Sequence, residues 1–80
     1  MQAQDIQALL EQKLENCEVS VQGDGSHFEI TVVGVMFDGL RAVKKQQLIY
    51  ALLNDEIASG AIHAVNMKLY TPQEWAQQTN

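Results

Sequence analysis

The chain has 80 residues, of which 46% are hydrophobic and 19% charged, and its formal net charge is −5. A chain of this length forms one small domain that buries little more than about 60% of its unfolded surface, so a large enclosed active site is not expected. The composition is globular rather than disordered, the longest apolar run is too short to span a membrane, and the amino terminus lacks a signal-peptide pattern. We therefore expect a single cytoplasmic domain over residues 1–80, with an ordered core at about 4–76 and no membrane contact.

The first predicted element is an amphipathic helix over residues 5–15. Its apolar side chains recur at helical spacing and form one stripe. They are Ile6, Leu9, Leu10 and Leu14. The opposite side of the helix is polar, so we expect the stripe to pack on the core.

A β-hairpin is predicted next. Two apolar rows alternate with polar residues, as in half-buried strands. The rows are Cys17, Val19 and Val21, then Phe28, Ile30 and Val32. Between them, the glycines of residues 23–25 tolerate positive φ and predict a tight turn. The same alternation places His27 on the polar side of the second strand.

Cys17 is the one cysteine of the sequence, so an intrachain disulfide is impossible and a reducing compartment is indicated. Because Cys17 shares strand parity with Val19 and Val21, we interpret it as a small buried hydrophobe. A thiolate ligand or a redox thiol is the alternative.

A second helix is predicted over residues 43–59, with Gly60 as the residue that ends it in the C′ position. One apolar side is made of Val43, Ile49, Tyr50, Leu53 and Ile57. Leu48 and Leu52 fall on a different side, where they form either a crowded core contact or a docking surface for another protein.

The basic residues are concentrated at the start of this helix. Residues 1–40 carry seven acidic side chains against the single Lys13, whereas Arg41, Lys44 and Lys45 stand together. The negative net charge argues against broad attraction to nucleic acid, since phosphate contacts dominate that affinity. The local cluster is either a solvated surface or a contact for phosphate or for an acidic partner protein.

The third predicted strand covers residues 62–69. His63, Val65, Met67 and Leu69 share one parity, so alternation alone places His63 toward the buried side. His27 and His63 are too far apart in sequence for a local metal motif and are two ligands short of a closed zinc site. Each histidine is therefore either one ligand of an incomplete metal site or a structural residue, at the surface for His27 and partly buried for His63.

A capping box then starts a short C-terminal helix that contains Trp75. Thr71 is the predicted N-cap, Pro72 occupies the first helical position, and Glu74 reaches back to the cap. The order of elements is helix, strand, strand, helix, strand, helix. Since the second and third strands are joined through a helix, we predict an α+β domain with helices on one three-stranded sheet.

No arrangement of residues indicates catalysis. Ser20, Ser26 and Ser59 lack a nucleophile-elbow context, and residues 23–25 open a strand rather than the helix that a phosphate loop requires. We therefore expect a binding protein and not an enzyme.

Five sequence segments, taken together and in order, resemble the BolA family, in particular its short bacterial IbaG/YrbA branch. They are Gly23-Asp24-Gly25-Ser26-His27-Phe28, Phe37-Asp38-Gly39, Val43-Lys44-Lys45-Gln46-Gln47, Ile62-His63-Ala64 and Thr71-Pro72-Gln73-Glu74-Trp75. The resemblance covers roughly residues 4–76. It implies an αββαβ fold similar to class II KH domains, with the short C-terminal helix added.

The resemblance implies a heterodimer with a monothiol glutaredoxin around a bridging [2Fe-2S] cluster, in iron-sulfur trafficking or in iron and redox signalling. The family's histidine before the final strand corresponds to His63, and its variable hairpin ligand corresponds to His27. Glutaredoxin and glutathione would supply the thiolates on the other iron, as imidazoles replace two thiolates in Rieske-type centres. The cluster is not expected to be required for folding, and the apo chain is expected to be a monomer or a weak homodimer.

The resemblance also implies a second role, as a DNA- or RNA-binding transcriptional regulator in stress responses, including acid stress. The helix-turn-helix-like segment of the family corresponds to residues 37–53. In that role Arg41, Lys44 and Lys45 are the predicted nucleic-acid contacts.

Overall fold

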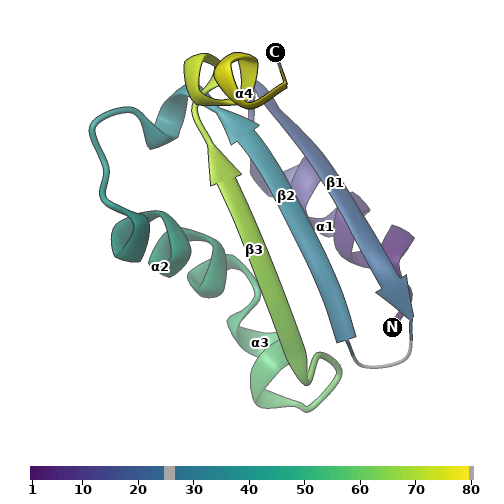
Figure 1. Ribbon diagram of the computed structural model, residues 1–80. Helices are drawn as coiled ribbons and strands as arrows, with labels where there is room; N and C mark the ends of the chain where they lie inside the picture. Colours follow the sequence, from purple (N-terminus) through teal and green to yellow (C-terminus); the bar gives the residue numbers. More distant parts are fainter. Residues whose placement is uncertain (25–26, 80) are drawn as a thin grey trace.

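The computed structural model of the chain describes residues 1–24 and 27–79 (Figure 1). Its elements in chain order are α1 (Ala3–Lys13), β1 (Cys17–Asp24), β2 (His27–Gly34), the 3-10 turn η1 (Val35–Phe37), α2 (Ala42–Leu52), α3 (Asn54–Ala58), β3 (Ala64–Tyr70) and α4 (Pro72–Thr79). The predicted α+β class is confirmed. Gly25 and Ser26 of the predicted turn lie outside the described residues.

The described strands form one sheet in the order β1-β2-β3. β1 and β2 are antiparallel and pair from Cys17 with Gly34 to Asp24 with His27. β2 and β3 are parallel, and the first residues of the two strands, His27 and Ala64, are paired. A parallel pair needs a crossover connection, which α2 and α3 supply here, as the sequence predicts.

The core lies on one face of the sheet. On β2 the alternate residues Phe28, Ile30 and Val32 are buried, and α1 and α2 pack against this row with Ile6, Leu10 and Ile49. Figure 1 shows α1 behind β1 and β2, with α2 and α3 along the β3 side. Burying each large aliphatic side chain of this cluster contributes about 1.5–3 kcal/mol.

The opposite face is covered by α4 at one end. Val33 has the other strand parity from the core row and is nevertheless only 8% exposed. Its neighbour in register is Tyr70, whose ring centroid lies 5.4 Å from that of Trp75 on α4. α4 contacts both β2 and β3. It therefore covers the end of the sheet where these two strands finish (Figure 1).

The single predicted helix over residues 43–59 is wrong in two respects. It divides at Leu53, whose ψ of 12° leaves the helical range and whose N–H is shared between the carbonyls of Ile49 and Tyr50. Val43 and Tyr50, predicted on the buried side, are 65% and 44% exposed. The buried stripe of α2 is instead built on a four-residue spacing, from Lys45 through Ile49 to Leu53.

Leu48 and Leu52, left open between a core contact and a docking surface, differ from each other. Leu52 packs against the core, whereas Leu48 is 38% exposed. The predicted end of this helical region at Gly60 is confirmed, because Gly60 follows the C-cap Ser59 and has φ +83°. No helix in the described part of the chain is long and apolar enough to cross a membrane.

Candidate functional site

The parallel pairing of β2 and β3 brings His27 and His63 together. His27 starts β2 opposite Ala64, and His63 directly precedes Ala64. Neighbouring strands lie about 4.8 Å apart and consecutive Cα atoms 3.8 Å apart, so the two histidine Cα atoms lie within about 9 Å. Both residues are exposed. The expectation that His63 faces the buried side is wrong, because β3 begins after it and strand alternation does not apply there.

A shallow hollow of about 470 Å³ lies beside His27 on the uncovered part of the sheet. The residues around it are Gln22, Gly23, His27, Phe28, Glu29, Ala64, Val65 and Asn66. Amide groups of Gln22 and Asn66 and the carboxylate of Glu29 give it a polar lining. Glu29 also holds Lys68 at 3.0 Å, and this contact raises the pKa of Lys68. Sequence patterns did not indicate the hollow, because it arises from strand pairing.

The two imidazoles are the nitrogen donors at this end of the sheet. In the described residues, no group of three or more histidine, cysteine, aspartate or glutamate side chains is placed to hold a metal ion. Two neutral imidazole nitrogens fit the pair of nitrogen ligands that one iron of a [2Fe-2S] centre can accept. The donors present at this end of the sheet would thus fit half of such a centre.

Cys17 lies too far away to complete that site. It pairs with Gly34, seven residues along β2 from His27, which corresponds to about 23 Å at 3.3 Å per residue. Its Sγ lies 3.6 Å from the Met36 Sδ, and burial raises the pKa of the thiol. Cys17 packs against the core, although it is only partly buried. The structure thus favours the packing interpretation over a thiolate.

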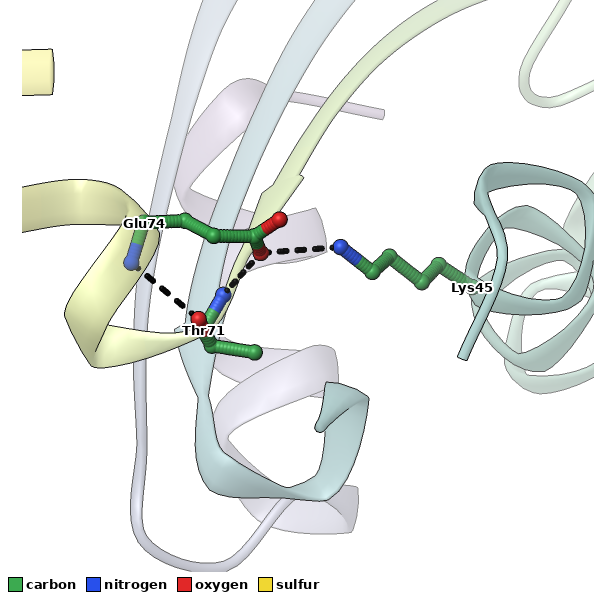
Figure 2. A network of polar contacts seen from close by, with 3 residues as sticks. All are labelled: Lys45, Thr71 and Glu74. Atoms are coloured by element: carbon green, nitrogen blue, oxygen red, sulfur yellow. Dashed lines mark hydrogen bonds and ion pairs between the residues drawn. The ribbon is translucent and has the colours of Figure 1, made fainter. Parts of the chain in front are cut away.

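The three predicted nucleic-acid contacts are not equivalent. Arg41 and Lys44 are exposed at the start of α2, but Lys45 is buried. The Lys45 Nζ lies 2.9 Å from the Glu74 Oε1 (Figure 2). It also lies 6.0 Å from the centre of the Phe37 ring. The interpretation of the cluster as a solvated surface therefore does not hold for Lys45. The helical spacing of Lys45 with Ile49 and Leu53 is the sequence signal that could have shown its burial.

Glu74 caps α4 through Thr71 and also pairs with Lys45. Its Oε1 accepts the Thr71 backbone N–H at 2.8 Å, and its own N–H donates to the Thr71 Oγ1 at 3.1 Å. This confirms the predicted capping box. The Thr71 N–H, and next the Lys45 ammonium, hold the pKa of the Glu74 carboxyl below its usual range. The link to Lys45 was missed because the two residues are 29 positions apart and belong to different helices.

The sequence profile of the family described as BolA-like protein matches residues 2–74. The acid stress protein IbaG of Escherichia coli strain K12 is 51% identical over 77 residues, which cover 96% of this chain and 92% of that protein. The chain belongs to the BolA-like family. A solved structure of a BolA homologue from Coxiella burnetii matches this BolA-like chain with a TM-score of 0.84 and 36% identity, covering 95% of this chain and 97% of that one.

A further relative carries a different name. The DNA-binding transcriptional regulator BolA of Haemophilus influenzae is 34% identical over 87 residues, which cover 91% of this BolA-like chain and 84% of that protein. The resemblance to the BolA family that the sequence segments indicate is therefore confirmed, including its IbaG branch. The names of the two relatives are those of a stress protein and a regulator.

Proposed function

We propose that this BolA-like protein pairs with a monothiol glutaredoxin and shares a bridging [2Fe-2S] cluster with it, in iron-sulfur trafficking or in iron and redox signalling under stress. The observation that supports the proposal is the placement of His27 and His63 side by side at one end of the sheet, exposed and without further ligands among the described residues. A two-ligand site of this kind becomes useful only when a second protein completes it.

The chain's own residues would contribute binding and positioning. The backbone pairing of β2 with β3 fixes the two histidines relative to each other before a partner arrives, which lowers the entropic cost of assembly. Their exposure leaves both rings open to a second protein. The cluster itself would supply electron transfer or would be passed on as cargo. The glutaredoxin and its glutathione would supply thiolates, because Cys17 lies at the other end of β2.

Anaerobic co-purification with a monothiol glutaredoxin tests this function. We expect a stable heterodimer whose visible absorption and circular dichroism differ from those of the glutaredoxin homodimer, because imidazoles replace thiolates at one iron. The control is the double variant His27→Ala with His63→Ala, which should leave the glutaredoxin spectrum unaltered. An unaltered spectrum with the wild-type chain would contradict the proposal.

We propose nucleic-acid binding as a second function, in stress-related regulation. Two observations support it: Arg41 and Lys44 are exposed together at the start of α2, and a relative of this chain is named a DNA-binding regulator. Two phosphate contacts correspond to a slope of about −1.8 for log affinity against log salt concentration. We expect weak binding of duplex DNA at low salt, and gel-shift titrations at two salt concentrations test it.

A further inference from the structure

One carboxylate oxygen joins α4 to α2. The Glu74 Oε1 accepts a hydrogen bond from the Thr71 N–H, which caps α4, and it also forms the ion pair with the Lys45 Nζ on α2. Figure 2 shows these contacts meeting at the start of α4. Because both contacts use the same atom, the position of α4 and the pairing of Lys45 are coupled.

Lys45 differs from Arg41 and Lys44, which are exposed, because its side chain is only 10% exposed. The side chain of its partner Glu74 is 48% exposed. A buried ammonium that loses its counter-ion is strongly destabilised, so it will pair with whichever anion is present. A cleft of about 260 Å³ opens beside it between α2 and β3, with Gln46, Lys68 and Tyr70 among its lining residues. An external anion therefore has a route to Lys45.

α4 is a short helix that contacts two strands of the sheet. It has eight residues, and it rests on β2 and β3 through the pairing of Trp75 with Tyr70 and the cover over Val33. Isolated helices of this length are marginal in water. The cap and the ion pair at Glu74 therefore contribute to holding α4 in place.

We propose that α4 is an autoinhibitory segment. The Glu74 carboxylate is the counter-ion of Lys45, the position that a phosphate of the nucleic-acid backbone would take. When Glu74 is displaced, Lys45 becomes a third cation for phosphate binding, beside the exposed Arg41 and Lys44. This inference rests on the second proposed function and names its regulation. The partner it fits is a nucleic acid, because a closely spaced array of phosphates can bind the two exposed cations and compete for the third at the same time.

The test compares two variants that change the net charge equally. Glu74→Gln removes the charge that holds Lys45 but keeps an amide oxygen able to accept the Thr71 N–H, so the cap is retained. Glu18→Gln is the control, because Glu18 is exposed on β1 and has no ion pair within the described residues. Each variant is titrated with a 20-base-pair DNA duplex at 50 and 200 mM salt.

We expect Glu74→Gln to bind the duplex about tenfold more tightly than Glu18→Gln at 50 mM salt, with a salt slope steeper by about 0.9, the value for one additional phosphate contact. Adding Lys45→Gln to Glu74→Gln should abolish the gain. Trp75 is the sole tryptophan, so its fluorescence reports whether α4 leaves Tyr70 when DNA binds the wild type.

The failures of the two proposals are distinguishable. Equal affinities and slopes for wild type, Glu74→Gln and Glu18→Gln would overturn the autoinhibition and leave nucleic-acid binding standing. Unchanged Trp75 fluorescence on saturation of the wild type with DNA would likewise overturn it. Absence of duplex binding by all variants at 50 mM salt would overturn both.

Discussion

His27 and His63 owe their positions to backbone pairing and not to packing of their own side chains. Both are exposed, and neither belongs to the buried cluster of the core. Their removal should therefore affect a bound cluster without affecting the fold. The place of His27 at the start of a strand could be predicted from the alternation of residues. His63 was predicted inside the third strand, but it lies directly before β3. Their proximity depends on the register of β2 with β3, which no local pattern encodes.

Replacing His63 with alanine should shorten the lifetime of the cluster in the glutaredoxin complex by about tenfold or more, since even outer-shell changes cost 10–100-fold in metal affinity. His27→Ala should have a similar or milder effect. The apo far-ultraviolet circular dichroism should be unchanged. Cys17→Ser is the matched control, and it should leave the visible spectrum as it is. A larger effect from Cys17 than from His63 would place the site at the other end of the sheet.

Gly23 is the glycine whose conformation bears on the site. Its φ is +128°, and a Cβ added there would lie 2.2 Å from the carbonyl oxygen of His27. Gly23→Ala should therefore destabilise the fold by about 3 kcal/mol or more through strain and overlap. Gly39→Ala is the control, because Gly39 also has positive φ but open space around it; it should cost about 1–2 kcal/mol. Urea denaturation measures both, and equal losses would contradict the steric argument.

The sequence around the start of α4 predicts its capping box but not its contact with α2. The segment from Thr71 to Glu74 predicts the capping box, and both of its hydrogen bonds are present. The same segment contains no information about Lys45, because that contact depends on how α2 lies against the sheet. The broken helix between α2 and α3 has a similar cause. Leu53 continues the buried stripe of Lys45 and Ile49, so the apolar pattern alone does not show that the backbone leaves the helical range there.

Acid should release α4 through Glu74. Because its folded-state pKa is lowered, Glu74 contributes stability that is fully present above its unfolded pKa of about 4.3. This stability is lost as pH falls below that value and through the lower folded-state pKa. Protonation leaves Lys45 buried without a counter-ion and weakens the cap. Near-ultraviolet circular dichroism of Trp75 should therefore decrease below that pH. In Glu74→Gln this transition should be absent, while the other carboxylates still titrate. Identical titrations of the two proteins would contradict the assignment.

The exposed cations and the histidine pair lie near different ends of β3. The net charge is −5, yet the start of α2 carries exposed Arg41 and Lys44, while the histidine pair lies beside the hollow at the beginning of β2 and β3. The arrangement of helices and strands could be predicted because alternation, glycine positions and the capping box all agreed. The pairing of Lys45 with Glu74 could not, because it joins two helices that are 29 positions apart in the sequence.

The start of α2 and the histidine pair are separate surfaces, so we expect that DNA binding can be lost without loss of glutaredoxin pairing. Arg41→Gln with Lys44→Gln removes two positive charges and should weaken duplex binding by about 100-fold at 50 mM salt, the contribution of two phosphate contacts. Gln4→Glu with Gln12→Glu changes the net charge equally on exposed positions of α1 and should weaken it only a few-fold. Lys45 is left in place because reversing a buried charge would disturb the fold. Glutaredoxin pairing, followed by the visible spectrum, should be the same in both double variants. Equal losses of DNA affinity in the two would show that net charge, and not the surface at the start of α2, governs the binding.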